Sequence, residues 1–250
     1  MSKWIDYTIE ERKTMVQTVS ELKQIDEASV EKDWWVTAVL YAVFHTSIGS
    51  FLSFKGGTSL SKGWRVINRF SEDIDLALNR DFFLNVKGLS CAKCASNTQI
   101  HNLRECAQDY IFGDFKTELE TELKNLGLYV SVVGDNDLTD AKGEQRKVPH
   151  DKDPSVIFVE YPSLYNNNSS ASYAAPVVKI EISVLSMVEP FEMRRISSLI
   201  EQAFSVENVD SDFVQTIKSV SPARTRTGLF SKKLFYSVRN TKGRCRELIG

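Results

Sequence analysis

Apolar residues recur at the helical period over the first fifty residues and predict two helices. The first runs from Thr8 to Leu22, where one stripe consists of Met15, Val19 and Leu22. The second runs from about Ala28 to Thr46, and its apolar stripe consists of Val30, Trp34, Ala38 and Tyr41. Its opposite side carries three consecutive charged residues, Glu31, Lys32 and Asp33. We expect residues 1–50 to form a helical layer that packs on the rest of the chain.

A period of two replaces the helical period in the next segment. Phe51–Lys55 is a short apolar strand candidate, and a Gly-Gly-Thr-Ser turn at residues 56–59 leads into a helix over Leu60–Ile67. The segment Asp73–Leu78 alternates cleanly and predicts a strand. Successive strand side chains point to opposite faces, so one face carries Asp73, Asp75 and Ala77 while the other is apolar.

One long helix and three strands are predicted further along, followed by a short helix. The long helix covers Asn97–Leu126, and the strands cover Leu128–Val133, Ser155–Tyr161 and Val177–Leu185. The polar stretch Gly134–Pro154 is typical of a long loop, and Arg194–Phe204 is a helix candidate.

This order of elements predicts an α+β fold, with a small mixed β-sheet flanked by helices and an N-terminal helical layer. We divide the chain into N-terminal helices at residues 1–50, a core domain at residues 51–222 and an atypical basic tail at residues 223–250. The tail is distinguished by its charge, because it holds eight Lys or Arg residues and a single acidic residue, Glu247.

The composition is that of a soluble globular protein, with 42% hydrophobic residues, 26% charged residues and a net charge of -2. No apolar run approaches the ~20 residues of a membrane span, and the polar N-terminus shows no signal peptide. We therefore expect a cytoplasmic protein without a membrane partner. Cys91 and Cys94 have zinc-type spacing but no second pair follows them, so we interpret the cysteines as free thiols.

The candidate chemistry begins at the turn formed by Gly56 and Gly57. Residues without a Cβ let the backbone approach a ligand closely, and a helix that begins there points free N–H groups at a phosphate. Thr58 and Ser59 add hydroxyl donors, and Lys62 adds a positive charge one turn later. An ordinary lysine on a helix surface is the alternative interpretation of Lys62.

Two carboxylates follow at Asp73 and Asp75, on one face of the predicted strand. Hard cations such as Mg²⁺ prefer oxygen ligands of this kind. Metal-binding carboxylates beside a phosphate cradle are what the transfer of a nucleotide from an NTP requires. Arg69 and Ser71 precede the pair and can contact phosphate oxygens.

A third carboxylate often completes a two-metal site, and Glu181 is our candidate. It alternates with Lys179 on one face of the strand Val177–Leu185. Lys179 either neutralises Glu181 or contacts a phosphate itself. A solvated sheet face is the alternative interpretation of both residues.

These motifs together resemble the AbiEii/AbiGii-type toxins of the DNA polymerase β-like nucleotidyltransferase superfamily. The resemblance rests on the Gly-Gly-Thr-Ser turn at residues 56–59 followed by Arg-Phe-Ser-Glu-Asp-Ile-Asp at residues 69–75. The segments Val30–Trp34, Glu160–Ser163 and Lys179–Ser183 are similar to other signatures of the family. The resemblance implies a toxin of a toxin–antitoxin or abortive-infection system that uses NTPs, with an antitoxin from an adjacent gene and RNA such as tRNA as acceptor.

The chain departs from the family pattern after Pro222. The expected family lysine has no secure counterpart there, and no Asp follows Asp212. We hypothesise that the tail is read out of frame or replaces a truncated helical region. The leading function is Mg²⁺-dependent transfer of a nucleotide to an acceptor hydroxyl. A degenerate module that binds NTP without turnover is the alternative, and kinase-like transfer of the γ-phosphate is a third interpretation.

Overall fold

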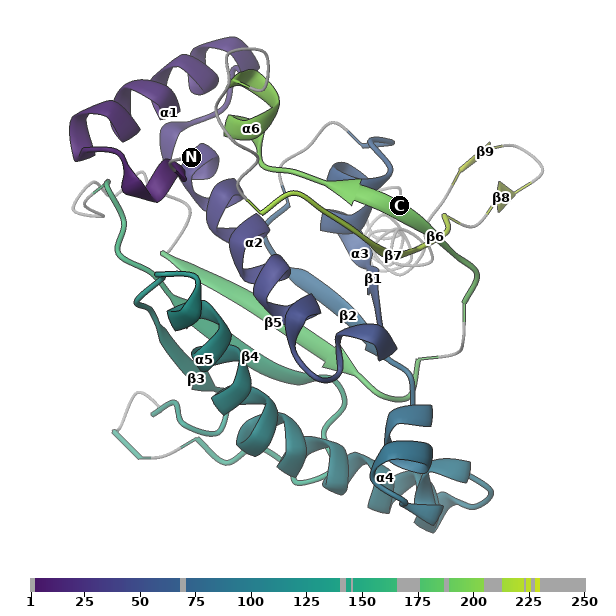
Figure 1. Cartoon of the computed structure of the whole chain (residues 1–250). Helices are drawn as coiled ribbons and strands as arrows, with labels where there is room; N and C mark the ends of the chain where they lie inside the picture. Colours follow the sequence, from purple (N-terminus) through teal and green to yellow (C-terminus); the bar gives the residue numbers. More distant parts are fainter. Residues whose placement is uncertain are drawn as a thin grey trace, which may run out of the picture.

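A seven-stranded mixed sheet forms the centre of the protein (Figure 1). The computed structural model describes residues 3–67, 71–139, 143–144, 146–165, 176–186, 189–204, 213–222, 224–225 and 228–229. The strand order is β3-β4-β5-β2-β1-β7-β6. The strands are β1 (Leu52–Lys55), β2 (Ile74–Leu78), β3 (Ser131–Gly134), β4 (Ser155–Glu160), β5 (Val177–Ser183), β6 (Phe191–Ile196) and β7 (Gln215–Val220). A separate pair consists of β8 (Arg224–Thr225) and β9 (Gly228–Leu229).

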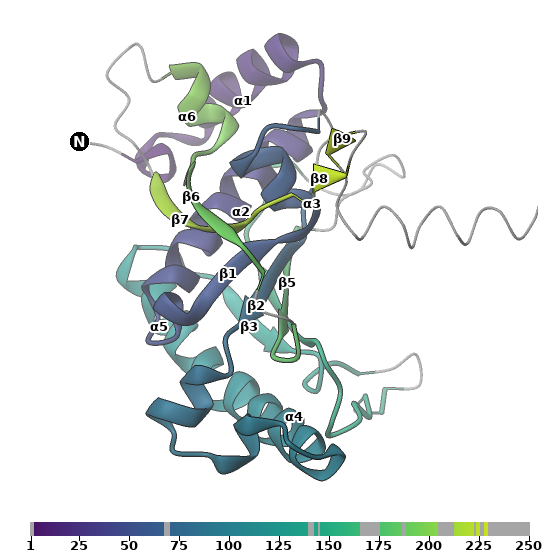
Figure 2. The same cartoon turned by 90° about the vertical axis from the view of Figure 1, so that its right-hand side faces the viewer.

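Two helices pack on one side of this sheet, α2 (Glu27–His45) and α5 (Lys116–Asn125). The helices α1 (Ile9–Lys23) and α6 (Leu199–Phe204) pack on α2 and on each other, and α4 (Asn97–Tyr110) leads through a π-helical segment into α5. The short helix α3 (Gly56–Thr58) follows β1 directly and continues into a π-helical turn, Ser59–Gly63. Figure 2 shows α2 and α5 on the same side of the sheet, so these two helices do not cover the opposite face of β2 and β5. None of the described helices is long and apolar enough to cross a membrane.

The directions of the strands make the sheet mixed. The neighbours β1–β7 and β2–β5 run parallel, and the other neighbouring pairs run antiparallel. The α+β fold class with a mixed sheet is therefore the one that the sequence predicts.

The main core lies between the sheet and α2. Fully buried apolar residues alternate along the three central strands, at Leu52, Phe54, Ile74, Leu76, Leu78, Val178, Ile180 and Ile182. Trp34 and Trp35 of α2 are 1% and 2% exposed, and the Trp35 ring stacks on Tyr161 at 4.9 Å between centroids. The two tryptophans are core residues, as the place of Trp34 in the apolar stripe predicts for that residue.

Side-chain caps start the first two helices where the sequence places them. Thr8 and Glu11 form a reciprocal capping box at the start of α1. Asp26 accepts a hydrogen bond of 2.9 Å from the Ser29 N–H at the start of α2. Because these caps satisfy N–H groups that a helix start leaves free, the helical layer has defined beginnings.

The later part of the chain differs from the prediction. Residues 191–196 form strand β6 in place of the start of the predicted helix, which begins only with α6 at Leu199. Strand β7 is absent from the prediction, and it pairs with β6 from Ile196–Gln215 to Phe191–Val220. The pairing with β7 explains the error, because hydrogen bonds to a distant strand override a weak local helical pattern. The expected helix over residues 97–126 is interrupted by a π-helical segment, Ile111–Phe115.

The charged side of α2 is buried along with its apolar side. Glu31, Lys32 and Asp33 are 1%, 4% and 4% exposed. Buried charges are stable only when they are paired and hydrogen-bonded. An amphipathic pattern with one polar side is therefore an incomplete description of this helix.

The basic tail lies outside the described residues apart from β8 and β9. Its interpretation as out-of-frame or truncated sequence stays a prediction, as does the division of the chain at residues 50 and 222.

Candidate functional site

Three charged residues stand in one row across the central strands. Lys55 of β1 pairs in register with Asp75 of β2, and Asp75 pairs with Glu181 of β5. Residues opposite one another on neighbouring strands share a face and are separated by ~5 Å. Their face is the one that α2 leaves uncovered, because the intervening residues Ile74 and Leu76 are buried in the core beneath α2. The structure thus brings Asp75 and Glu181 side by side, although they are far apart in sequence.

The glycine turn lies directly against the Asp75 carboxylate. Gly56 has φ +76°, a conformation that L side chains rarely adopt. A Cβ built on Gly56 would lie 1.8 Å from the Asp75 Oδ2 atom. Only glycine leaves room for this approach of backbone and carboxylate, and Asp75 itself is 4% exposed. The turn and the acidic strand therefore belong to one site.

Thr58 and Ser71 fasten the turn to the loop before β2. The Thr58 hydroxyl lies 2.5 Å from the Asp73 carbonyl oxygen and 3.0 Å from the Ser71 Oγ atom. Thr58 is fully buried, so its hydroxyl serves this internal contact in the structure. The hydrogen bonds hold the end of α3 beside Asp73.

Ser59 is the second hydroxyl residue of the turn. Its Oγ atom is buried and has no hydrogen-bond partner among the described residues. An unsatisfied buried hydroxyl is costly, and a ligand oxygen is one group that satisfies it. Gly57, which precedes the two hydroxyl residues, is half-buried.

Lys62 faces the protein interior. Its Nζ atom forms an ion pair of 2.6 Å with Asp33 Oδ1 and donates a 3.0 Å hydrogen bond to Thr37 Oγ1. The lysine is 8% exposed. The structure thus gives its charge a protein partner in α2, and its burial differs from the surface position considered from the sequence. The phosphate contact of Lys62 stays a prediction.

Lys179 and Glu181 form an ion pair on the open face of β5. The Lys179 Nζ atom lies 2.6 Å from Glu181 Oε1. This hydrogen bond raises the pKa of Lys179, and the nearby carboxylates of Asp73 and Asp75 act in the same direction. The main cause of the raised pKa is therefore the partner within the same strand, Glu181.

The donor chemistry of the acidic strand suits a hard cation, since Asp73 and Asp75 offer carboxylate oxygens beside the turn. Within the described parts of the chain, no group of three or more His, Cys, Asp or Glu side chains is arranged to hold a metal ion. The candidate third ligand, Glu181, is instead bonded to Lys179. Arg69 lies outside the described residues.

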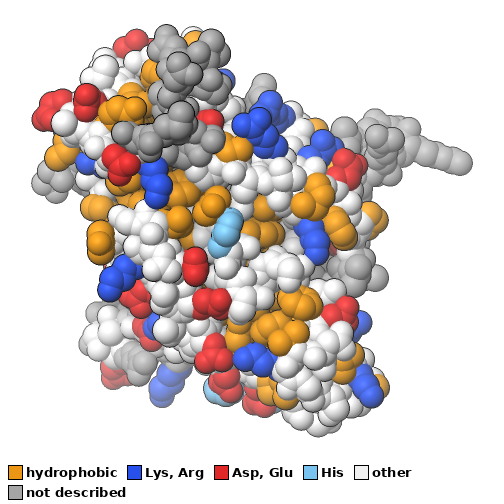
Figure 3. All heavy atoms as spheres, in the orientation of Figure 1, with side chains coloured by type: hydrophobic (Ala, Val, Ile, Leu, Met, Phe, Trp, Pro, Cys, Tyr) orange, Lys and Arg blue, Asp and Glu red, His pale blue; other side chains and the backbone are white. Residues whose placement is uncertain are grey.

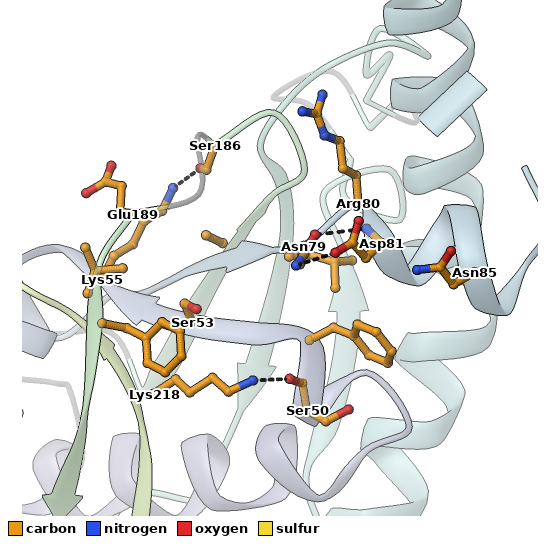
Figure 4. Close-up of a pocket in the computed structure, with 15 residues that line it drawn as sticks. Ser50, Ser53, Lys55, Asn79, Arg80, Asp81, Asn85, Ser186, Glu189 and Lys218 are labelled. Carbon is orange, nitrogen blue, oxygen red and sulfur yellow. Dashed lines mark hydrogen bonds between the residues drawn. The ribbon is translucent and has the colours of Figure 1, made fainter. Parts of the chain in front are cut away.

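A cavity of about 340 Å³ continues from Lys55 along the same face of β1 and β2 (Figure 4). Lys55 Nζ donates a hydrogen bond of 2.5 Å to Ser186 Oγ at one end of the cavity, and Lys218 Nζ donates one of 2.6 Å to the Ser50 carbonyl oxygen. The sequence prediction did not include these residues. Lys55 could have been predicted as a site residue, because it directly precedes the glycine turn.

The face covered by helices carries mixed charges. Figure 3 shows acidic and basic side chains interspersed with hydrophobic ones on the side of α2 and α5. This surface does not present one continuous basic area in that view. The polar row of the open sheet face therefore remains the best-defined candidate site.

A glycine turn after a strand, placed against an acidic neighbouring strand, agrees with the family match of the chain. A family model described as nucleotidyl transferase AbiEii toxin, type IV toxin–antitoxin system, matches residues 38–244. The match spans most of the chain, and the protein belongs to this family.

Among solved structures, the chain is similar to MenT4, a nucleotidyltransferase toxin from Mycobacterium tuberculosis H37Rv. The sequences are 18% identical, the TM-score is 0.41, and the match covers 82% of this chain. It spans 54%, about half, of the MenT4 chain. A comparison with curated proteins finds no match.

Proposed function

We propose that this protein transfers a nucleotide from an NTP to an acceptor hydroxyl, with RNA as the acceptor. The observation that carries the proposal is the contact between Gly56 and Asp75, where a Cβ would meet the carboxylate at 1.8 Å. A turn that cradles phosphates and a carboxylate that binds their metal must lie together for this reaction. Membership in the AbiEii toxin family supports the same reaction class.

In this proposal the phosphates lie on the Gly56–Ser59 turn, where backbone N–H groups and the Ser59 hydroxyl donate to their oxygens. Asp73 and Asp75 would hold Mg²⁺, which neutralises phosphate charge and activates the acceptor hydroxyl when it is bound. Glu181 stands beside Asp75 as the candidate third carboxylate, and Lys179 balances its charge. Arg69 and Ser71 stay candidates for phosphate contact.

Labelled NTPs test this function directly. The protein is incubated with Mg²⁺, total RNA, and NTP labelled at either the α- or the γ-phosphate, beside an Asp73→Ala/Asp75→Ala variant. We expect label from the α position to enter RNA with the unaltered chain only. Transfer of label from the γ position contradicts nucleotidyl transfer and indicates a kinase.

A degenerate module that binds NTP without turnover is the second candidate function. It is favoured by the Lys179–Glu181 ion pair, which occupies the third carboxylate in the structure. NTP binding that depends on Asp73 and Asp75 without any transfer supports this candidate.

The family also suggests the setting in which the protein acts. We propose a cytoplasmic toxin whose partner is an antitoxin protein from an adjacent gene. Copurification of the two products when both genes are expressed together tests the partnership. Toxicity of this chain alone that is relieved by the neighbouring gene supports it further.

A further inference from the structure

We propose that Lys32 and Asp33 of α2 are positioning residues, which hold the two halves of the nucleotide site in place through Glu72 and Lys62. The inference rests on the proposed function, because it concerns the same turn and acidic strand. Neither α2 residue needs to touch the nucleotide. Both contact residues near the end of β1 and the start of β2, where the turn and the acidic strand meet.

The first connection runs from α2 to the acidic strand. The Lys32 Nζ atom lies 2.5 Å from Glu72 Oε2. Glu72 is the residue between Ser71 and Asp73, so this ion pair fixes the backbone from which the Asp73 side chain projects. The lysine side chain is 6% exposed and the glutamate side chain is 41% exposed. A pair that is buried on one side is less screened by solvent than a surface pair.

The second connection runs from the adjacent residue of α2 to the turn. Asp33 Oδ1 lies 2.6 Å from Lys62 Nζ, and both side chains are 6% exposed. Lys62 follows the phosphate turn by one helical turn. The other oxygen of the same carboxylate, Oδ2, accepts a 2.7 Å hydrogen bond from the Leu199 N–H. Asp33 is therefore held from two sides and provides a fixed anchor for Lys62.

Hydrogen bonds from Thr58 link the turn to the residues before β2 and so join the two connections. The Thr58 hydroxyl lies 2.5 Å from the Asp73 carbonyl oxygen and 3.0 Å from Ser71 Oγ. A closed set of contacts results, which we call the polar circuit; its members are Lys32, Asp33, Thr58, Lys62, Ser71 and Glu72. Because the circuit begins and ends on adjacent residues of one helix, the turn and the acidic strand cannot shift independently.

Directional contacts are suited to this task. Apolar packing tolerates small displacements, whereas a buried ion pair holds two groups at a defined separation and is costly to break. Small displacements of groups that position a substrate can reduce activity strongly. The circuit therefore gives a physical reason for two of the three consecutive charges inside this buried helix, Lys32 and Asp33.

The neighbouring residue Glu31 supplies a matched control. It is buried in the same helix but points elsewhere, since its carboxylate accepts hydrogen bonds from Ser163 Oγ at 2.6 Å and from the Leu164 N–H at 2.8 Å. Glu31→Gln thus perturbs a buried charge of α2 without touching the circuit.

Calorimetric titration with each of the four Mg-NTPs, together with thermal melting, tests the inference on the full chain. We expect Lys32→Met to weaken NTP binding by about tenfold or more, and Lys32→Arg to restore most of the affinity. Glu31→Gln should bind NTP like the unaltered chain. Glu72→Gln changes a partly exposed residue and keeps the test decisive if Lys32→Met fails to fold; we expect it to weaken binding in the same direction.

The outcomes separate this inference from the function on which it rests. If the unaltered chain binds none of the four Mg-NTPs, the proposed function fails and the inference fails with it. If the unaltered chain binds NTP and both Lys32→Met and Glu72→Gln bind it like Glu31→Gln, only the positioning role is overturned. Equal loss of affinity in Glu31→Gln likewise overturns it, because the effect would then come from general loosening of α2.

Discussion

The strongest constraint on any single residue falls on Gly56. It combines a backbone conformation that disfavours side chains with direct contact between its backbone and the Asp75 carboxylate. Glycines in this protein are not equivalent in this respect. Gly113, for example, has open space where a Cβ would stand and no positive φ.

Replacement of Gly56 by alanine should displace the acidic strand. We expect Gly56→Ala to lower NTP affinity by at least about tenfold and to cost ~1–2 kcal/mol of stability from backbone strain alone. Calorimetric titration with Mg-ATP and chemical unfolding measure the two effects. Gly113→Ala is the matched control, and it should leave NTP affinity unchanged. Because Gly113 lies with open space inside the helical segment Ile111–Phe115, this substitution should raise stability, by ~0.5–1 kcal/mol. Unchanged NTP binding in Gly56→Ala would show that the turn does not contact the nucleotide.

The strand that carries Asp75 could be predicted from the sequence, whereas the partners of the candidate site residues could not. Alternation predicts this strand, which the structure has as β2, because strand geometry has a period of two. Asp73 directly precedes β2, and its place on the same face as Asp75 stays a prediction. The partner of Lys62 was not predictable, since Asp33 lies on a separate helix and the pairing exists only in the folded chain. The place of Glu181 beside Asp75 likewise required the register of β2 and β5, which neither strand carries in its own pattern.

At the scale of the elements, α2 has a dual role. Its apolar residues build the core, and its three consecutive charges each contact a different segment: Glu31 contacts residues 163–164, Lys32 contacts Glu72, and Asp33 contacts both Lys62 and Leu199.

The failure to predict strands β6 and β7 from the sequence also belongs to the scale of the elements. The two strands pair with each other, and β7 also pairs with β1, so their local sequence predicts them weakly.

The buried carboxyl of Glu31 makes stability depend on pH. Burial raises the pKa of Glu31 above its usual value, although hydrogen bonds from Ser163 and Leu164 oppose the shift. A carboxyl whose pKa is raised on folding binds its proton more tightly in the folded chain, so its contribution is full below the unfolded pKa and is lost as pH rises through the folded pKa. The stability of the unaltered chain relative to Glu31→Gln should therefore fall as pH rises from about 4 towards neutrality.

Chemical unfolding of both proteins across this pH range measures the difference. An opposite slope, with the unaltered chain gaining relative stability as pH rises, would mean that the hydrogen bonds outweigh burial at this carboxyl. Because the comparison is a difference between two otherwise identical chains, titration of the other acidic residues cancels to first order.

For the whole molecule, the helical layer and the sheet share one hydrophobic core. Trp4, Trp34 and Trp35 all belong to the buried core with the central strands. The range that matches the family model begins at residue 38, inside α2. The residues before it therefore contribute both core and polar circuit, although they lie outside the matched range.

A chain shortened to start at residue 38 should not fold cooperatively. It loses three buried tryptophans, and removal of even one such side chain from a core costs ~3–5 kcal/mol. Circular dichroism with thermal melting compares it with the full chain. A sharp melting transition in the shortened chain would show that the sheet is stable without its N-terminal helical layer.

The register between β2 and β5 has a consequence for how this protein tolerates change. Ile74 stands opposite Ile180 and Leu76 opposite Ile182, while the acids Asp75 and Glu181 alternate with them. A shift of the β2–β5 register by one residue would bury a carboxylate in the apolar core beneath the tryptophans. The free-energy cost of that burial is far above the cost of a local rearrangement. Burial of the apolar side chains on one face of the sheet thus fixes the alignment of Asp75 and Glu181 on the other face. Substitutions that loosen the packing of the core should therefore lower activity before they unfold the protein.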